Sequence, residues 1–550
     1  MKPNMTTGRA AFLQLLVDEG VTHLFGNPGT TELAIMEVVP DFPQLEFILG
    51  LQESVVMAMA DGYCRASGRL AAANVHVMPG LGNAMGALYN AKFSGSPVIL
   101  TAGQQEQGHG LLEPMLYEPL VPVAQPLVKW AVEVTRAADL PRIIHRAAKI
   151  ALTPPTGPVF LSLPGDVLDE KLELDMGRPV RIDGAVRPTD ATLHEIAHRL
   201  MAAKRPAILA GHELSTRDAF GEAAKLAEAI GAAVYAGSIP YSAQFRSEHP
   251  AFMGALTRLQ KQVRSTLEGH DLLLVLGADL LRMSVYSPVE PLPPALPVIH
   301  ISERAHELGK NYRTDIAVHA DVKQTLAALL PLVKRSEAAQ QRLAELKPHN
   351  WSAQRDKARL DAMMAAETKP IDPAYLMLRF TESLPRDAVV VDEGLVSTNS
   401  LPKFLVNRAP RDYYGLASGG LGFAIPGAVG ISLALPGRPI AAMVGDGSAM
   451  YAIQGLWTAA HHQLPITYVI ANNRGYRIIK ERLVSFRKTD KFMGMDIREP
   501  DIDFVSVAKS FGLAARRVTD PQDIAAALRE GFASGRPNLI DMRVADGFGN

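Results

Sequence analysis

Apolar runs of strand length alternate with amphipathic, helix-length stretches along most of the chain. Such runs stand at residues 72–77, 206–210, 272–276 and 439–444. Alternation of this kind is typical of doubly wound parallel sheets, in which each strand is followed by a covering helix. At about 150 residues per domain, a chain of 550 residues forms three or four domains. The pattern therefore predicts an α/β fold of three domains, each a doubly wound parallel sheet.

Changes in composition mark the expected boundaries. An acidic, proline-containing stretch closes the first block before Pro188, and a charged helical segment at about 322–369 is interpreted as a linker. We expect domains at residues 1–180, 188–345 and 370–550.

The charge balance narrows the classes of partner. Lys and Arg total 56 against 57 Asp and Glu, a net charge of -1. This balance argues against nucleic acid and against an anionic membrane, since both attract basic surfaces. The one cysteine, Cys64, excludes an internal disulfide and a cysteine-based metal site. No signal-peptide pattern opens the sequence, and we expect a cytoplasmic enzyme.

Polar residues follow two neighbouring predicted strands of the third domain. The strand at residues 439–444 is followed by Gly-Asp-Gly at 445–447, and the strand at 466–470 leads to Asn473. Open α/β sheets bind ligands at the carboxyl ends of their strands, so Asp446 and Asn473 should share one edge. Their oxygens suit Mg²⁺ held jointly with phosphate. The Gly-Asp-Gly segment alone, or Asn473 alone, is equally consistent with a plain turn. The two together favour a binding site.

A helix is expected directly after this turn. Apolar residues recur at helical spacing, and they predict one helix that begins near Ser448: Met450, Ile453, Leu456, Trp457 and Ala460. Gly445 and Gly447 let the backbone approach a phosphate closely, and the start of a helix directs N–H groups at it.

Gly-Asp-Gly followed after 24 residues by Asn-Asn resembles the thiamine diphosphate binding motif. On this motif the chain is identified as a member of the thiamine diphosphate-dependent decarboxylase/carboligase family, the superfamily of pyruvate decarboxylase and acetolactate synthase. Within the family it most resembles the benzoylformate decarboxylases. The resemblance implies a pyrimidine-binding, a middle Rossmann-like and a pyrophosphate-binding domain, with thiamine diphosphate and Mg²⁺ as cofactors.

The same resemblance implies a set of site residues. Asp446, Asn473 and the main-chain carbonyl of Gly475 would hold the metal. Contacts to the cofactor would come from Asn27, Pro28, Gly29, Glu53, Asn83, Gly419, Leu421, Gly445, Gly447, Ser448 and Tyr476.

Five residues are candidates for catalysis. The resemblance implies that Glu53 activates the cofactor, although a lone glutamate is by default a solvated residue. His76 is the candidate acid/base, because imidazole titrates near neutral pH, and a core histidine is the alternative. Thr30 would contact the substrate carboxylate, and Glu32 would organise water near the thiazolium ring. Ser284 stands where the relatives have a second histidine, which serine cannot replace as a proton donor near pH 7.

Other histidines are less informative. The pair at 461–462 is interpreted as structural, and His109, in a glycine-rich segment, is left open.

The implied reaction is non-oxidative decarboxylation of a 2-oxo acid, similar to benzoylformate, to an aldehyde and carbon dioxide. An acetolactate synthase-type carboligase, or an acyl-CoA-using lyase with an anionic substrate, is the alternative. Gly415 and Arg482 align with phenylalanines of the relatives' aryl pocket, which weakens the case for an aryl substrate.

A basic run lies beside the expected site. Residues 474–491 hold seven Lys or Arg and two acids, a net charge of +5. A solvated basic face is the plain interpretation, and selection of an anionic or larger substrate is the alternative. Members of this family build each active site from two subunits. The resemblance therefore implies at least a homodimer, and a homotetramer is expected.

Overall fold

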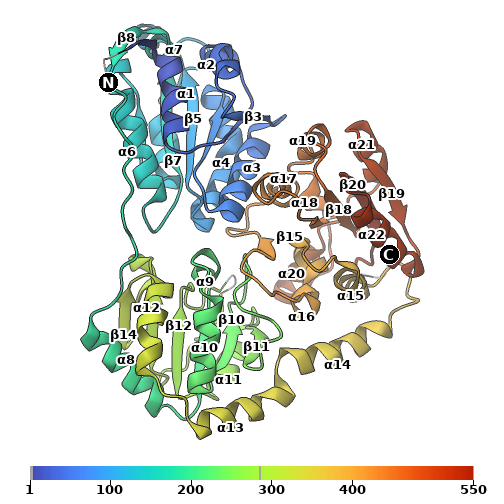
Figure 1. The fold of residues 1–550 in the computed structure, drawn as a ribbon. Helices are drawn as coiled ribbons and strands as arrows, with labels where there is room; N and C mark the ends of the chain where they lie inside the picture. Colours follow the sequence, from blue (N-terminus) through green and yellow to red (C-terminus); the bar gives the residue numbers. More distant parts are fainter. Residues whose placement is uncertain (1–3, 284–285, 549–550) are drawn as a thin grey trace.

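Three parallel sheets of six strands each organise the molecule (Figure 1), a computed structural model that describes residues 4–283 and 286–548. Helices cover the faces of each sheet, so the predicted α/β fold of three doubly wound domains is confirmed. The predicted residue boundaries of the domains stay a prediction.

The first sheet has the strand order β3-β2-β4-β5-β7-β6. Its strands are β2 (His23–Gly26), β3 (Glu46–Leu49), β4 (Ala71–Val75), β5 (Val98–Gln104), β6 (Ala131–Glu133) and β7 (Val159–Pro164). Around it lie α1 (Gly8–Asp18), α2 (Leu33–Val38), α3 (Glu53–Ser67), α4 (Val77–Ser94), α5 (Leu120–Ala124), α6 (Leu140–Leu152) and α7 (Gly165–Asp169). A separate antiparallel pair joins β1 (Asn4–Thr7) to β8 (Lys171–Leu174).

The middle sheet has the order β11-β10-β9-β12-β13-β14. Its strands are β9 (Pro206–Ala210), β10 (Ala233–Ala236), β11 (Phe252–Ala255), β12 (Leu272–Leu276), β13 (Val298–Ser302) and β14 (Ile316–His319). Its helices are α8 (Asp190–Ala202), α9 (Glu213–Thr216), α10 (Phe220–Ile230), α11 (Gln260–Leu267) and α12 (Val322–Leu329). Two further helices, α13 (Glu337–Leu346) and α14 (Trp351–Met363), run toward the third domain (Figure 1).

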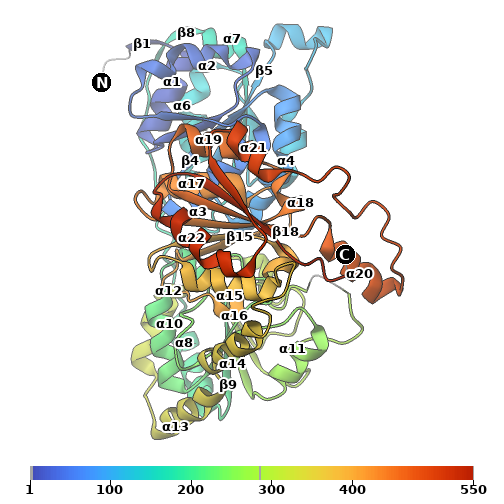
Figure 2. The same cartoon turned by 90° about the vertical axis from the view of Figure 1, so that its right-hand side faces the viewer.

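The third sheet has the order β16-β15-β17-β18-β20-β19. Its strands are β15 (Val389–Glu393), β16 (Tyr413–Gly415), β17 (Ile440–Gly445), β18 (Ile466–Asn472), β19 (Ala514–Val518) and β20 (Asn538–Arg543). The helices are α15 (Pro373–Ser383), α16 (Leu401–Phe404), α17 (Ala424–Ala434), α18 (Asp446–Ala449), α19 (Gly455–His461), α20 (Arg477–Arg487), α21 (Phe504–Ser510) and α22 (Ile524–Ala533). In Figure 2, α20 and the long segment after it stand out from the body of this domain.

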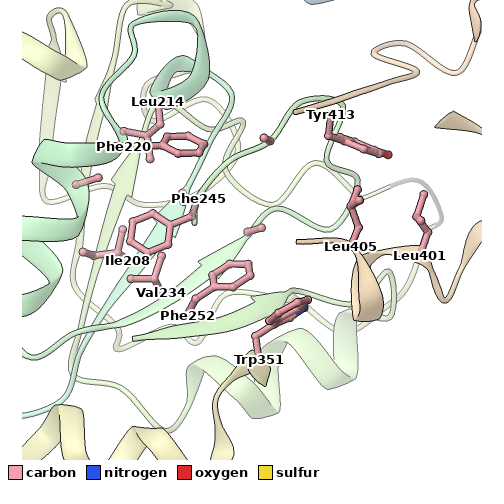
Figure 3. Packing of buried hydrophobic residues seen from close by; sticks show 14 of the residues in the cluster. Ile208, Leu214, Phe220, Val234, Phe245, Phe252, Trp351, Leu401, Leu405 and Tyr413 are labelled. Atoms are coloured by element: carbon pink, nitrogen blue, oxygen red, sulfur yellow. The ribbon is translucent and has the colours of Figure 1, made fainter. Parts of the chain in front are cut away.

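The third sheet contributes to two hydrophobic cores at once. Successive strand residues point to opposite faces. Along β17, Ile440 and Val444 pack in a core shared with the first domain, whereas Ala441 and Met443 pack in a core shared with the middle domain. Figure 3 shows the second core, where Phe252 of the middle domain lies beside Trp351 of α14, and Tyr413 of β16 belongs to the same cluster.

The first and third domains meet through α3 and α17. These helices approach so closely that a Cβ on Gly430 would overlap the carbonyl oxygen of Met59. A Cβ on Gly62 would likewise overlap the Gly427 carbonyl. Glycine is therefore required on both sides of this contact.

Two sequence predictions need correction. The helix expected to run on from Ser448 is split into α18 and α19, with residues 450–454 forming turns between them. The second helix begins at Gly455, which packs closely against the backbone of Pro426 in α17. The expected linker at 322–369 is also partly wrong, because Val322 and Leu326 of α12 are buried in the middle-domain core.

Within residues 4–283 and 286–548, the search for an apolar helix long enough to cross a bilayer finds none.

Candidate active site

A cavity of about 250 Å³ opens at the carboxyl edge of the third sheet. β17 and β18 are neighbours there, as predicted, so the turns that follow them meet. Eight of the residues expected to hold a cofactor or metal line this cavity: Leu421, Gly445, Asp446, Gly447, Ser448, Asn473, Gly475 and Tyr476.

The two expected metal ligands converge on one backbone group. The amide of Gly475 donates to the Asp446 carboxylate at 3.1 Å and to the side-chain oxygen of Asn473 at 3.0 Å. Burial raises the pKa of Asp446 to about 6. A buried carboxylate and an amide oxygen this close together suit a hard cation such as Mg²⁺. Among the described residues there is no group of three or more His, Cys, Asp or Glu side chains placed for a metal.

The turn around Gly447 is closely packed on one side and carries an unpartnered hydroxyl at Ser448. A Cβ at position 447 would come within 2.8 Å of the Tyr476 ring, so the ring packs directly on the glycine. The hydroxyl of Ser448 is buried and has no hydrogen-bond partner in the described part of the chain. Buried hydroxyls nearly always have a partner, and a phosphate oxygen would provide one.

The loop at residues 418–422 closes the cavity through Leu421. Gly419 and Gly422 have φ of 89° and 101°, a region that favours glycine. Glu393, at the end of β15, accepts hydrogen bonds of 2.6 Å from the amides of Gly422 and Ala424. Burial raises the pKa of Glu393 to about 7. Glu393 was not among the residues predicted from the sequence, although an acid at the end of a buried strand was a signal for it.

Glu53 lies at the start of α3, at the carboxyl edge of the first sheet. Its two carboxylate oxygens accept hydrogen bonds from Asn27 at 3.1 Å and Asn83 at 2.9 Å. Three of the expected residues are therefore brought together, and the carboxylate is held in one orientation.

His76 follows β4 and is held by the turn after β2. Its Nδ1 lies 2.8 Å from a Glu32 oxygen and 3.1 Å from the Thr31 hydroxyl. A Cβ on Gly29 would overlap the imidazole ring, so only glycine fits beside it. Glu32 is fully buried, and it also accepts from the amides of Gly29 and Gly103, each at 2.9 Å. Thr31 was missed, because Thr30 beside it was the expected contact.

Comparison with known families decides the assignment. Residues 6–115 match the N-terminal TPP binding domain of thiamine pyrophosphate enzymes, residues 193–329 their central domain and residues 397–542 their C-terminal TPP binding domain. The chain belongs to the thiamine pyrophosphate enzyme family. Thiamine pyrophosphate (thiamine diphosphate) is accordingly its cofactor.

Individual relatives span the whole chain. Benzoylformate decarboxylase of Pseudomonas aeruginosa is 33% identical over 542 residues, covering 98% of this chain and 99% of its own. Acetolactate synthase isozyme 3 large subunit of Escherichia coli is 25% identical over 548 residues, covering 98% and 94%. A solved structure, the thiamine diphosphate-dependent 4-hydroxybenzoylformate decarboxylase of Rhodococcus jostii RHA1, superposes with a TM-score of 0.87 at 32% identity, covering 98% and 99%.

The two sets of predicted site residues in this thiamine pyrophosphate enzyme do not line one cavity within a single chain. All residues that line the cavity at Asp446 fall within 394–479, and none comes from the set around Glu53 and His76. In that set, Pro28, Thr30 and Asn83 are exposed. Ser284 lies outside the described residues.

Other sequence candidates lie away from the cavity. Gly415 is buried in β16, and Arg482 packs over Phe486 on α20, so neither lines the space at Asp446. His109 is exposed. His461 stacks on Trp457 with ring centroids 4.9 Å apart, as expected of a structural residue.

The basic run is partly neutralised by carboxylates. Arg474 faces Asp501 at 3.8 Å, Arg477 pairs with Glu481 at 2.8 Å, and buried Lys480 lies 2.6 Å from Asp496. No ion pair is present in residues 4–283 and 286–548 for the rest of the cations, Arg482, Arg487, Lys488 and Lys491. Of the seven cations, Arg477 alone lines the cavity.

Proposed function

We propose that the chain catalyses the thiamine diphosphate- and Mg²⁺-dependent, non-oxidative decarboxylation of a benzoylformate-like 2-oxo acid to an aldehyde and carbon dioxide. The observation that carries this proposal is the convergence of Asp446 and Asn473 on Gly475, beside the unpartnered Ser448 hydroxyl. The two benzoylformate decarboxylase-type relatives, each matched over 98% of the chain, support the choice of substrate class.

Residues at the two sheet edges would share the binding of the cofactor. Asp446, the side chain of Asn473 and the carbonyl of Gly475 would hold Mg²⁺, and Ser448 would donate to the diphosphate. When bound, the cofactor supplies a carbon nucleophile and accepts the electron pair that carbon dioxide leaves behind. Glu53, oriented by Asn27 and Asn83, would exchange a proton with the aminopyrimidine ring.

His76 would transfer protons at the reacting carbonyl. Its Nδ1 faces Glu32, which fixes the ring and leaves Nε2 for the substrate. Thr30 would contact the substrate carboxylate. Because Glu32 is buried and already has several donors, its contribution would be to orient His76.

The site would be completed by a second subunit. The exposed set around Glu53 of one chain would cover the Asp446 cavity of the other, so a homodimer is the smallest active form, and we expect a homotetramer. Apolar side chains beside both halves are exposed and would be buried in such a dimer. These include Leu111 at 93%, Met115 at 84% and Met493 at 93% exposure.

A carboligase of the acetolactate synthase type is the second candidate. The Escherichia coli acetolactate synthase subunit matches 98% of the chain, and the cations of α20 without an ion pair would favour an anionic substrate.

A panel of 2-oxo acids separates the two candidates. Benzoylformate, 4-hydroxybenzoylformate, pyruvate and a dicarboxylic 2-oxo acid would each be supplied with thiamine diphosphate and Mg²⁺, and carbon dioxide, aldehyde and acyloin would be measured separately. We expect aldehyde and carbon dioxide in equal amounts from benzoylformate, and loss of turnover in Glu53→Gln. Acyloin as the main product would favour the carboligase, and no turnover of either aryl substrate would refute the leading proposal.

A further inference from the structure

A buried lysine lies behind the turn that would hold the metal. Lys480, in the first turn of α20, is 1% exposed. Its amide donates to the carbonyl of Tyr476, which lines the cavity at Asp446, but Lys480 itself does not line that cavity. Lysines are almost never fully buried unless they are paired. Any influence of this cation on the site must therefore act through the residues that surround it.

Two carboxylates and two aromatic rings surround the ammonium group. Its Nζ donates to Oδ1 of Asp496 at 2.6 Å and lies 3.9 Å from Asp546. It also lies 5.2 Å from the ring centroid of Phe492 and 5.8 Å from that of Phe548, and the two rings meet edge to face. Residues 492 and 496 belong to the segment after α20, whereas 546 and 548 belong to the C-terminal end, which Figure 2 shows beside α20. One cation therefore joins three parts of the chain.

The segment that the lysine holds is paired with the backbone around Gly475. Two backbone hydrogen bonds of 2.8 Å join residues 495 and 497 to residues 476 and 474. A Cβ on Gly475 would come within 2.7 Å of the Met495 carbonyl oxygen and 3.6 Å of Oδ1 of Asp496, the atom that binds Lys480. The carbonyl of Gly475 is the backbone ligand proposed above for Mg²⁺. Its position therefore depends on the segment that Lys480 anchors.

Loss of the ammonium group would affect the two carboxylates unequally. Asp546 would keep Arg498 at 3.0 Å and the amide of Phe548 at 2.9 Å. Among the described residues, Asp496 would keep as a cation within 4 Å only Nε of Arg498, at 3.6 Å. The C-terminal end would thus stay anchored, and the segment beside Gly475 would lose its closest ion pair.

We propose that Lys480 is a positioning residue for Mg²⁺. By fixing Asp496, it holds residues 492–498 against the turn at 474–476 and so keeps the Gly475 carbonyl in place for the metal. The inference rests on the function proposed above, in which Asp446, Asn473 and Gly475 bind Mg²⁺ together with thiamine diphosphate. It adds a residue outside the cavity to those within it, and its effect belongs to metal binding.

Titration of Mg²⁺ into the full-length enzyme, with thiamine diphosphate in excess, tests the proposal. Calorimetry gives Kd for Mg²⁺ without any need for turnover, so the result does not depend on the identity of the substrate. In Lys480→Met, which keeps most of the side-chain stem without its charge, we expect Kd to rise at least tenfold. We expect kcat at saturating Mg²⁺ to fall less than threefold. A lysine that only stabilised the fold would lower Tm and leave Kd unchanged.

Two further variants make the result specific. Asp496→Asn removes the other charge of the pair at a partly exposed position and should raise Kd for Mg²⁺ by a similar factor. The double variant should be little weaker than either single one, because both changes break the same pair. Asp496→Asn alone decides the question if Lys480→Met does not fold. Lys491→Met, at an exposed lysine of the same segment, is the matched control and should bind Mg²⁺ as the wild type does.

Equal Kd values in the wild type and in the variants at 480 and 496 would overturn the inference and leave the proposed function intact. The inference is also overturned if Lys491→Met weakens binding as much as Lys480→Met, since net charge would then be the cause. Fully additive effects of the two single variants would show that they do not act through one pair, with the same consequence. A wild type that binds no Mg²⁺ would instead refute the metal site itself, and with it both proposals.

Discussion

The absence of a side chain at Gly29 leaves space for the imidazole ring of His76. The ring lies against Gly29, whose φ of −119° and ψ of −163° are accessible to any residue. The need for glycine here is therefore steric and does not come from the backbone conformation. It links the Asn-Pro-Gly-Thr turn to the histidine across 47 residues of sequence.

Gly29→Ala should displace the imidazole, because a Cβ would overlap the ring. We expect kcat to fall by about 10²-fold, the typical size of a general acid–base contribution, with only a small change in Tm. Gly82→Ala is the matched control: its Cβ meets no atom within 4 Å, so activity should be retained. Equal activity of the two variants would refute the assignment of His76.

Glu393 makes stability depend on pH. Its pKa in the folded protein is about 7, above the ordinary value of 4.5, because burial disfavours the charge. Between these values the folded state holds the proton more tightly than the unfolded state. The free energy of unfolding therefore falls by up to about 3 kcal/mol as pH rises from 4.5 to 7.

Glu393→Gln should remove this dependence, since an amide does not titrate. We expect the Tm of the variant to rise relative to that of the wild type between pH 5 and pH 8, as measured by scanning calorimetry. Glu367→Gln, at an exposed position, should follow the wild type at every pH. A Tm difference between Glu393→Gln and the wild type that stays constant with pH would contradict the assignment.

At the scale of elements, the contact between α3 and α17 joins two sheets that would otherwise be separate domains. α3 begins with Glu53, and α17 follows the loop at residues 418–422, so the helices that touch are adjacent to residues of the two proposed half-sites. Their separation is set by Gly62 and Gly430.

Gly430→Ala should destabilise the protein by about 1–3 kcal/mol or more, because the new methyl group would overlap the Met59 carbonyl and force the helices apart. Thermal unfolding would show this as a lower Tm. Gly221→Ala in α10, where a Cβ meets no atom within 4 Å, is the control and should keep or slightly raise the Tm. Equal Tm values for Gly430→Ala and Gly221→Ala would contradict this prediction, because α3 and α17 would then accommodate the methyl group without loss of stability.

The sequence predicted strands better than helix interruptions. β17 and β18 are apolar runs buried on both faces, and such runs are readily recognised. No local pattern marked the division between α18 and α19, and Gly455 at the start of α19 packs against Pro426, which is distant in sequence. Asp446, Ser448 and Asn473 were predicted to lie at one sheet edge because they closely follow strands, and they line one cavity there. Glu393 and Thr31 were missed, because their contacts come from segments that only the folded chain brings together.

At the scale of the whole molecule, the separated half-sites predict that activity requires two chains. Glu53→Gln and Asp446→Asn should each be inactive alone. Refolded together in equal amounts, they should regain about a quarter of wild-type activity, because half of the dimers are mixed and each mixed dimer has one intact site. Each variant refolded alone is the control. A mixture that stays inactive would show that both half-sites act within one chain.

The third sheet has consequences for how the protein melts. One face of β17 packs in a core with the first domain and the other face in a core with the middle domain. Neither neighbour can therefore unfold without exposing one side of the same strand to water. Three domains of this size would ordinarily melt in steps, whereas here we expect a single cooperative transition in which the calorimetric and van't Hoff enthalpies agree for the assembled protein.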